Sequence, residues 1–165
     1  SVNPANFLNV TLVFVLFLMW IGGASQSTAG GIKVNTFAAI LINLKAIVLG
    51  HKKVTAFNRT IATASIRRAN AVVTLSILSY TLLSLIILLL EPHLPARSLL
   101  FETSSALFTV GSSLGVTPML STASKAILIS AMFLGRVGII SLLIGVTGNR
   151  HDYPVQYPTD NIIIN

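Results

Sequence analysis

A short run of small residues has the composition that backbone-carbonyl ion sites require. It consists of Thr109, Val110, Gly111, Ser112 and Ser113. Potassium filters replace the hydration shell of the ion with carbonyl oxygens, so they need residues that allow an unusual extended backbone. Gly111 accepts a positive φ without a Cβ penalty, and its small neighbours leave the carbonyls free to face an axis. We predict a cation filter here, although a Thr-Val-Gly triplet also occurs in ordinary turns.

A second run of small residues interrupts the first apolar segment of the chain. Residues 22–31 read GGASQSTAGG, with four glycines among small polar side chains. Glycine is unfavourable in helices, and Ser and Thr hydroxyls compete for backbone partners, so this run predicts a helix break. Broken backbone at membrane depth is tolerated only where protein or a water-filled cavity surrounds it. The run is therefore a functional candidate, with a short connecting loop in water as the alternative.

Arg136 is a third candidate, because it lies in an apolar segment that extends from 126 to 144 and contains only two serines. A cation at membrane depth is costly and normally faces a cavity or a partner. Gly135 and Gly138 beside it allow another backbone to approach closely. The alternative is an arginine that snorkels to the interface. We favour a functional role, because the inner helix end is predicted at 146–150 and Arg136 lies about two to three turns inside it.

The other residues that could do chemistry indicate fewer functions. Glu102 either lines an outer pore mouth and attracts cations, or anchors the local structure by hydrogen bonds. The histidines lie far apart, at positions 51, 93 and 151, so we expect no metal site beyond the transported ion. The phosphate-binding spacing G-x-x-x-x-G-K-[ST] is absent. The four acidic residues form no paired-carboxylate or Ser/His/Asp arrangement, so we expect no enzyme and no cofactor.

The composition places these candidates in a membrane. Of 165 residues, 53% are hydrophobic and only 9% are charged, whereas an average soluble domain has about 25% charged residues. The mean hydropathy is +0.84. A net charge of +7 suggests nucleic acid as a partner, but the cations are few and the uncharged runs between them are long. We therefore predict an integral membrane protein that does not bind nucleic acid, and the absence of cysteine excludes disulfides.

The first half of the chain must position the glycine-rich run. We expect a broken transmembrane helix over 1–50, with apolar helices at 5–21 and 32–50 on either side of 22–31. Residues 51–68 form a basic linker, which the excess of Lys and Arg places in the cytoplasm. The absence of an initiator methionine suggests a fragment.

The second half must position the filter. Residues 69–150 are predicted to form a helix, a pore loop and a second helix. The uncharged run 69–90 is long enough to cross a bilayer, and 91–98 is an external turn with two prolines. A half-length helix at 98–108 and the turn-forming segment 109–118 predict a re-entrant hairpin, and a long final helix follows. The polar tail 151–165 is expected in the cytoplasm.

Several of these segments resemble one family. MWIGGASQSTAGGIKVNTFA is similar to the glycine-rich intramembrane loop of the Trk/Ktr/HKT superfamily of potassium transporters. FETSSALFTVGSSLGVTPMLS resembles its fourth pore helix and filter, and MFLGRVGIISLL resembles its arginine-bearing last helix. YPTDNIIIN is similar to the tail of these proteins. The resemblance covers nearly the whole chain, with the motifs in the expected order.

The resemblance implies a fold and a site. The family fold has four repeats of helix, pore hairpin and helix around one pore, so this chain would be all-α and partial, with the end of the third repeat and all of the fourth. One quarter of the filter would lie at 109–112. The implied gate is an intramembrane loop beneath the filter together with a cation beside it: Gly22, Gly23, Ser27, Thr28, Gly30, Gly31, Lys33 and Arg136.

The function implied is uptake of potassium ions across the inner or plasma membrane by a multi-pass protein. The implied partners are the remaining repeats, a second copy in a homodimer and a cytoplasmic nucleotide-binding regulatory subunit. Two alternatives stay open. One is a secondary transporter with a substrate site at the broken helix, and the other is a structural membrane subunit without an ion path.

Overall fold

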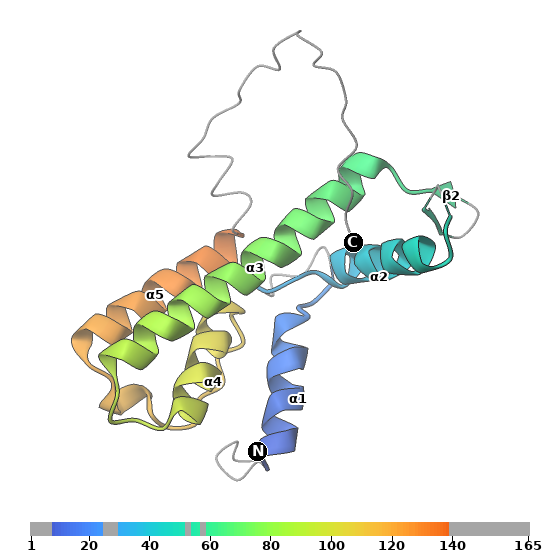
Figure 1. Ribbon diagram of the computed structural model, residues 1–165. Helices are drawn as coiled ribbons and strands as arrows, with labels where there is room; N and C mark the ends of the chain where they lie inside the picture. Colours follow the sequence, from blue (N-terminus) through green and yellow to red (C-terminus); the bar gives the residue numbers. More distant parts are fainter. Residues whose placement is uncertain (1–7, 25–29, 52–53, 57–58, 139–165) are drawn as a thin grey trace, which may run out of the picture.

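The computed structural model describes residues 8–24, 30–51, 54–56 and 59–138. Within these ranges the chain is mainly helical, as the sequence predicts (Figure 1). The elements are α1 (Asn9–Trp20), α2 (Val34–Val48), β1 (Thr55–Ala56), β2 (Arg59–Thr60), α3 (Thr63–Leu90), α4 (Ala96–Leu107), the 3₁₀ turn η2 (Thr117–Met119) and α5 (Thr122–Val137).

Helix α3 is the element that fits a bilayer best. Its 28 residues give a length of about 42 Å. Among the described residues it is the one helix long and apolar enough to cross a membrane, whereas α1 and α2 are shorter apolar helices. The sequence predicted this span within 69–90, but the helix already begins at Thr63. The exposed Arg67 and Arg68 lie in its first turns, because a charge at a helix end does not stop the helix.

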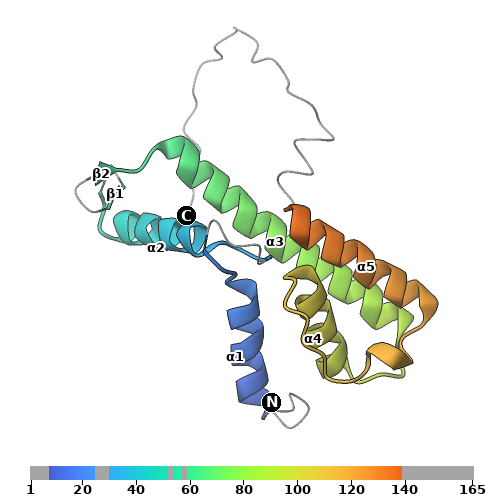
Figure 2. The ribbon, with the colours of Figure 1, turned by 180° about the vertical axis from the view of Figure 1, so that it is seen from behind.

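Helices α3, α4 and α5 form one packed unit. Figures 1 and 2 show α5 lying along α3, with the shorter α4 beside both. Their shared core consists of buried apolar side chains, namely Ile87, Leu99, Ala106, Leu120, Leu128 and Ala131. A Cβ on Gly135 of α5 would overlap the carbonyl oxygen of Leu107. The end of α5 therefore lies directly on the backbone at the end of α4.

Glu91 joins the end of α3 to the start of α5 by hydrogen bonds. Its Oε1 accepts hydrogen bonds from the Ser121 N–H at 2.8 Å and from the Ser124 hydroxyl at 2.7 Å. Ser121 also caps α5, because its Oγ accepts the Ser124 N–H at 3.2 Å. The carboxylate of Glu91, the residue directly after α3, therefore binds the start of α5.

Helix α1 packs against the other side of α4. Their common core contains Leu12, Met19, Phe101, Leu107 and Phe108. The Trp20 indole N–H donates to the Ser76 hydroxyl at 3.0 Å, which joins the end of α1 to α3. The Phe37 ring of α2 makes edge contacts with Trp20 and with Phe17.

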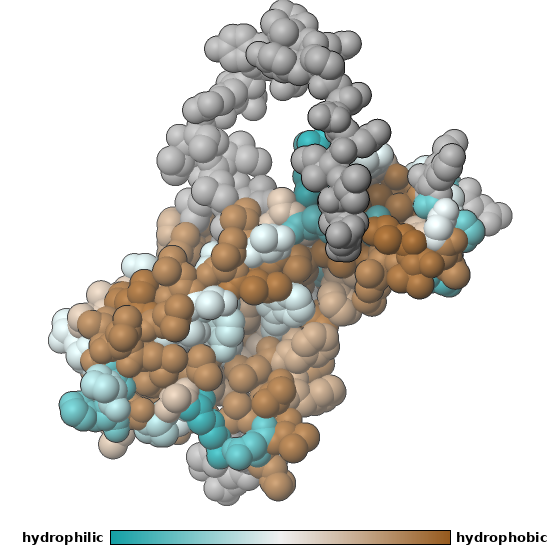
Figure 3. Space-filling view, in the orientation of Figure 1, coloured by the Kyte–Doolittle hydropathy of each residue, from teal (hydrophilic) through white to brown (hydrophobic). Residues whose placement is uncertain are grey.

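The basic linker contains a small hairpin, in which Thr55 pairs with Thr60 and Ala56 with Arg59 in antiparallel register. Outside this region the visible surface is largely hydrophobic (Figure 3). Large apolar side chains are exposed on α1, α2 and α3, for example Phe14, Ile47 and Leu89. Contiguous apolar surface of this kind marks contact with lipid or with further protein.

Candidate functional site

The predicted filter begins at the carboxyl end of α4. The N–H groups of Thr109 and Val110 donate to the carbonyls of Ala106 and Ser105, at 3.2 and 2.9 Å. Thr109 has a φ of 54° and Gly111 a φ of 81°. A threonine in the left-handed region costs of order 1–3 kcal/mol, and such strain clusters at functional sites. Positive φ therefore occurs at Gly111, where the sequence allows it, and also two residues earlier, at Thr109.

The middle of the filter segment borders open space on this chain. The Val110 side chain is 44% exposed, and a Cβ built on Gly111 would meet nothing within 4 Å. Further along, Ser113 is bonded to Glu102 through its hydroxyl. Val110 and Gly111 therefore border open space, while the segment is held at both ends.

Glu102 is buried and anchors the return of the chain after the filter. Besides the Ser113 hydroxyl, it accepts the Leu114 N–H at 3.1 Å and the Thr117 hydroxyl at 3.0 Å. Of the two roles left open by the sequence, these contacts favour the hydrogen-bonded anchor.

The ends of the glycine-rich run lie in direct backbone contact. The Gly22 N–H donates to the Ile32 carbonyl at 2.7 Å, and the Ile32 N–H donates to the Trp20 carbonyl at 3.0 Å. A Cβ on Gly22 would overlap the Gly30 carbonyl oxygen. The chain thus leaves α1 and returns towards α2 at one point. Ser27 and Thr28, two of the predicted gate residues, lie outside the described residues.

Gly30 connects this run to the filter. Its N–H donates to Oγ1 of Thr109 at 2.6 Å, across 79 positions of sequence. A Cβ on Gly30 would lie 2.5 Å from the same oxygen and 2.7 Å from the Phe108 carbonyl oxygen. The glycine is therefore required for this approach, and the end of the run lies against the first filter residue.

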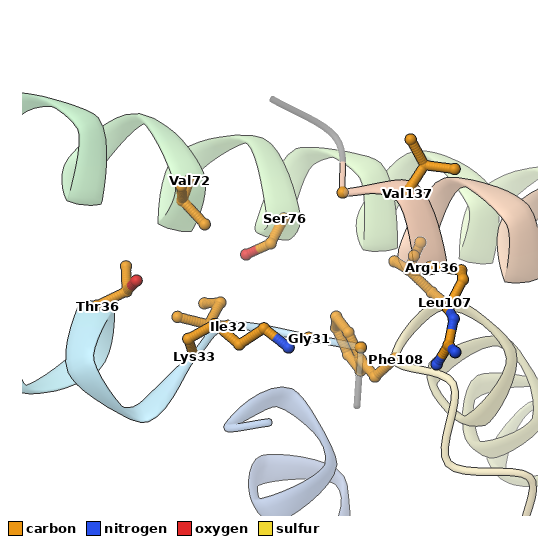
Figure 4. Close-up of a pocket in the computed structure, with 13 residues that line it drawn as sticks. Gly31, Ile32, Lys33, Thr36, Val72, Ser76, Leu107, Phe108, Arg136 and Val137 are labelled. Carbon is orange, nitrogen blue, oxygen red and sulfur yellow. The ribbon is translucent and has the colours of Figure 1, made fainter. Parts of the chain in front are cut away.

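Arg136 and Lys33 line one cavity of about 360 Å³ with the end of the glycine-rich run. Figure 4 shows their side chains entering from different sides, Lys33 from the segment before α2 and Arg136 from α5. The remaining lining residues are Gly30, Gly31, Ile32, Thr36, Val72, Ser76, Leu107, Phe108, Gly135, Val137 and Gly138. The charged groups in this described lining are thus both cations, which disfavour the entry of another cation.

The sequence suggested that Arg136 lies well inside a long helix, but in the described residues it lies next to the end of α5. Helix α5 ends at Val137, and Gly138 has a φ of 85°. The predicted continuation towards Arg150 lies outside the described residues. Within the described part, Arg136 is the basic residue of the last turn of α5.

A second cavity, of about 490 Å³, lies on the filter side of Gly30. Its lining includes Gly22, Gly23, Thr109, Val110 and Ser112. Gly30 and Phe108 line both cavities. The contact between the glycine-rich run and the filter therefore lies between the filter-side space and the space beside Arg136.

Most of the predicted site residues are therefore near one another, and the structure adds Phe108 and Ser76. Phe108 was read as part of an amphipathic helix, and nothing in its sequence position indicated that it borders both cavities. Ser76 is one of several small polar residues within the apolar span 69–90, so the sequence did not single it out. Gly135 carried a clearer signal, because a glycine beside an arginine in an apolar segment predicts a close backbone contact.

Comparison with known proteins gives a consistent picture. Residues 1–149 match the family model TrkH, described as a cation transport protein. The chain is 35% identical to the potassium/sodium uptake protein NtpJ of Enterococcus hirae, over 99% of this chain and 38% of that protein. It is 38% identical to the Ktr system potassium uptake protein B of Bacillus subtilis, over 92% of this chain and 34% of that protein.

The Ktr system potassium uptake protein D of Bacillus subtilis is 36% identical, over 99% of this chain and 36% of that protein. The chain thus spans a little over a third of the length of these relatives.

Proposed function

The chain belongs to the TrkH family of cation transport proteins, integral membrane proteins, and from this membership we propose that it forms part of a multi-pass pore for potassium uptake. The relatives named for potassium uptake support the choice of ion. The observation that carries the proposal is the hydrogen bond from Gly30 to Thr109, because it brings a glycine-rich run against the start of a strained segment suited to ion coordination.

In this proposal, α3, α4 and α5 form one helix–pore hairpin–helix repeat. The segment 109–113 contributes one part of a filter, and the remaining repeats of the complete protein supply the others. The open space beside Gly111 supports this arrangement, since carbonyls must face an axis that several segments share. The apolar outer faces of α1 and α2 then contact those repeats or lipid.

The run 22–31 acts as a gate below the filter, together with Lys33 and Arg136. A guanidinium has five N–H donors for loop carbonyls and hydroxyls, and its charge opposes potassium in the closed passage. The cavity that Arg136 shares with Gly30 and Gly31 supports this role.

We further propose that the protein works with other subunits. Two relatives are named as proteins of a Ktr system, which favours a multi-component transporter. A homodimer with a cytoplasmic nucleotide-binding regulatory subunit is the assembly that we propose. The basic segment between α2 and α3 then faces the cytoplasm and the turn at 91–97 faces outward.

The filter is tested by Gly111→Ser in the full-length protein. A Cβ at a φ of 81° restricts the backbone that aims the carbonyls, so the ratio of potassium to sodium uptake should fall. Unchanged selectivity in folded, inserted protein would contradict the filter assignment.

The gate is tested by deleting residues 24–29. Since Gly22 and Gly30 are already in contact, the deletion joins ends that lie together, and potassium flux in liposomes should rise. Arg136→Ala should raise flux partly, and the double change should add little beyond the deletion, because effects within one network are not additive. Fully additive gains would mean that the run is not held by Arg136.

A further inference from the structure

Glu102 is a charged residue in a position where charge is expensive. It lies on α4 with 6% of its surface exposed, between buried neighbours on the same helix. Burying a carboxylate is costly unless hydrogen bonds replace the water that it loses. The groups that supply these hydrogen bonds are therefore fixed to it strongly.

The described donors to Glu102 come from residues 113–117, which are the last residue of the predicted filter and the four residues after it. Oε1 accepts the Ser113 hydroxyl and, at 3.1 Å, the Leu114 N–H, while Oε2 accepts the Thr117 hydroxyl at 3.0 Å. Ser113 Oγ in turn accepts the Gly115 N–H at 2.9 Å. One carboxylate thus binds Ser113, Leu114 and Thr117 directly, and holds Gly115 through Ser113. Hydrogen bonds to an ionised acceptor are about twice as strong as neutral ones.

The same helix also holds the inner end of the filter. The carbonyls of Ser105 and Ala106, one turn beyond Glu102, accept the N–H groups of Val110 and Thr109. The filter segment is therefore a short bridge between two attachments on α4. A Cβ built on Gly111, at its centre, would meet nothing within 4 Å, and the two attachments hold the backbone on either side of it.

We propose that Glu102 is a positioning residue that fixes the outer end of the filter and thereby sets its preference for potassium over sodium. The inference rests on the proposed filter. Selectivity depends on the number and placement of the carbonyl dipoles, and a loosened outer end lets the carbonyls close around a smaller ion.

The test uses the full-length transporter in liposomes, with the ratio of initial potassium and sodium uptake rates as the readout. Glu102→Gln keeps the side-chain size but removes the charge and directs a donor at groups that already donate. Thr117→Val keeps the shape and removes one hydroxyl outside the filter. We expect the ratio to fall about tenfold for Glu102→Gln and about threefold for Thr117→Val.

Two matched variants separate positioning from general stability. Thr117→Ser restores the hydroxyl and should restore the ratio. Glu91→Gln removes the carboxylate that fastens α5 and should leave the ratio unchanged even if the protein melts earlier. If Glu102→Gln does not fold, Thr117→Val and its serine rescue decide the question.

An unchanged ratio in both Glu102→Gln and Thr117→Val overturns the proposal, as does an equal fall in Glu91→Gln. Gly111→Ser distinguishes this failure from that of the filter. If Gly111→Ser lowers the ratio and the Glu102 and Thr117 variants do not, the filter stands without the positioning role. If none of them lowers it, the filter assignment fails as well.

Discussion

The return of the chain after α4 and the ends of the glycine-rich run are held in opposite ways. Glu91 and Glu102 fasten the outer return through hydroxyl and backbone donors. The ends of the run are held by neutral backbone hydrogen bonds at Gly22 and Ile32, and by Gly30 on Thr109. Side chains with charge fix one region, whereas close contact between glycines forms the other.

This difference matches what each region is proposed to do. A charge-assisted hydrogen bond in a buried site is strong and costly to leave unmade, which suits a filter that must keep its geometry. A neutral hydrogen bond contributes about 1 kcal/mol and is readily exchanged for one to water, which suits a gate that must move away from the filter. The contact from Gly30 to Thr109 is where the two regions meet.

The largest expected effect comes from Gly135→Val, which disturbs the contact between α5 and the end of α4, next to both regions. The new side chain would overlap the Leu107 carbonyl and separate α5 from the end of α4, at a cost of about 3 kcal/mol. We expect a loss of folded protein, measured by thermal melting and size-exclusion chromatography in detergent. Ala126→Val, at an exposed position of the same helix, is the control and should melt normally. Normal melting of Gly135→Val would contradict the packing described here.

Gly30→Ala should have an intermediate effect that is confined to the gate. The added methyl group would press on Thr109 and Phe108. The run should therefore lose its contact with Thr109, and potassium flux should rise roughly fivefold. Uptake into liposomes measures this rise.

Gly50→Ala is the contrasting control for the gate. Its Cβ meets nothing within 4 Å, although its φ of 68° strains an alanine. It should therefore lower stability slightly and leave flux unchanged. Lower flux in Gly30→Ala than in the parent protein would indicate that the contact with Thr109 assists conduction.

The smallest effect concerns Glu91 and pH. Its hydrogen bonds from Ser121 and Ser124 hold the pKa of the carboxyl below its ordinary value of 4.5. Because the folded-state pKa is the lower one, the stabilisation is present above pH 4.5 and is lost as the pH falls through the folded value. Thermal melting between pH 6 and 3 should show this loss, with pH values chosen around that ordinary pKa.

Glu91→Gln is the control for the pH effect. The variant should melt earlier at neutral pH, and its melting should depend less on pH below 4.5. An unchanged acid dependence in this variant would assign the effect to other groups.

Much of the helical plan was predictable from local pattern. The apolar run 69–90 and the short helix at 98–108 correspond to α3 and α4, because hydrophobic length and turn residues act locally. The boundaries were less predictable. The sequence pattern assigned residues 63–68 to the basic linker, but they form the first turns of α3, because exposed arginines are compatible with a helix.

The sequence by itself determined the membrane class and the break between two helices, because composition and glycine content restrict the backbone wherever the chain folds. It also supplied the small residues on which the proposed filter rests. Only the tertiary structure decided what these residues contact. Two roles for Glu102 were equally compatible with its position, and burial against the donors of 113–117 distinguishes them. Likewise, Gly30 and Thr109 are 79 positions apart. Their contact depends on how α1 and α5 pack around α4, and no local sequence signal encodes that packing.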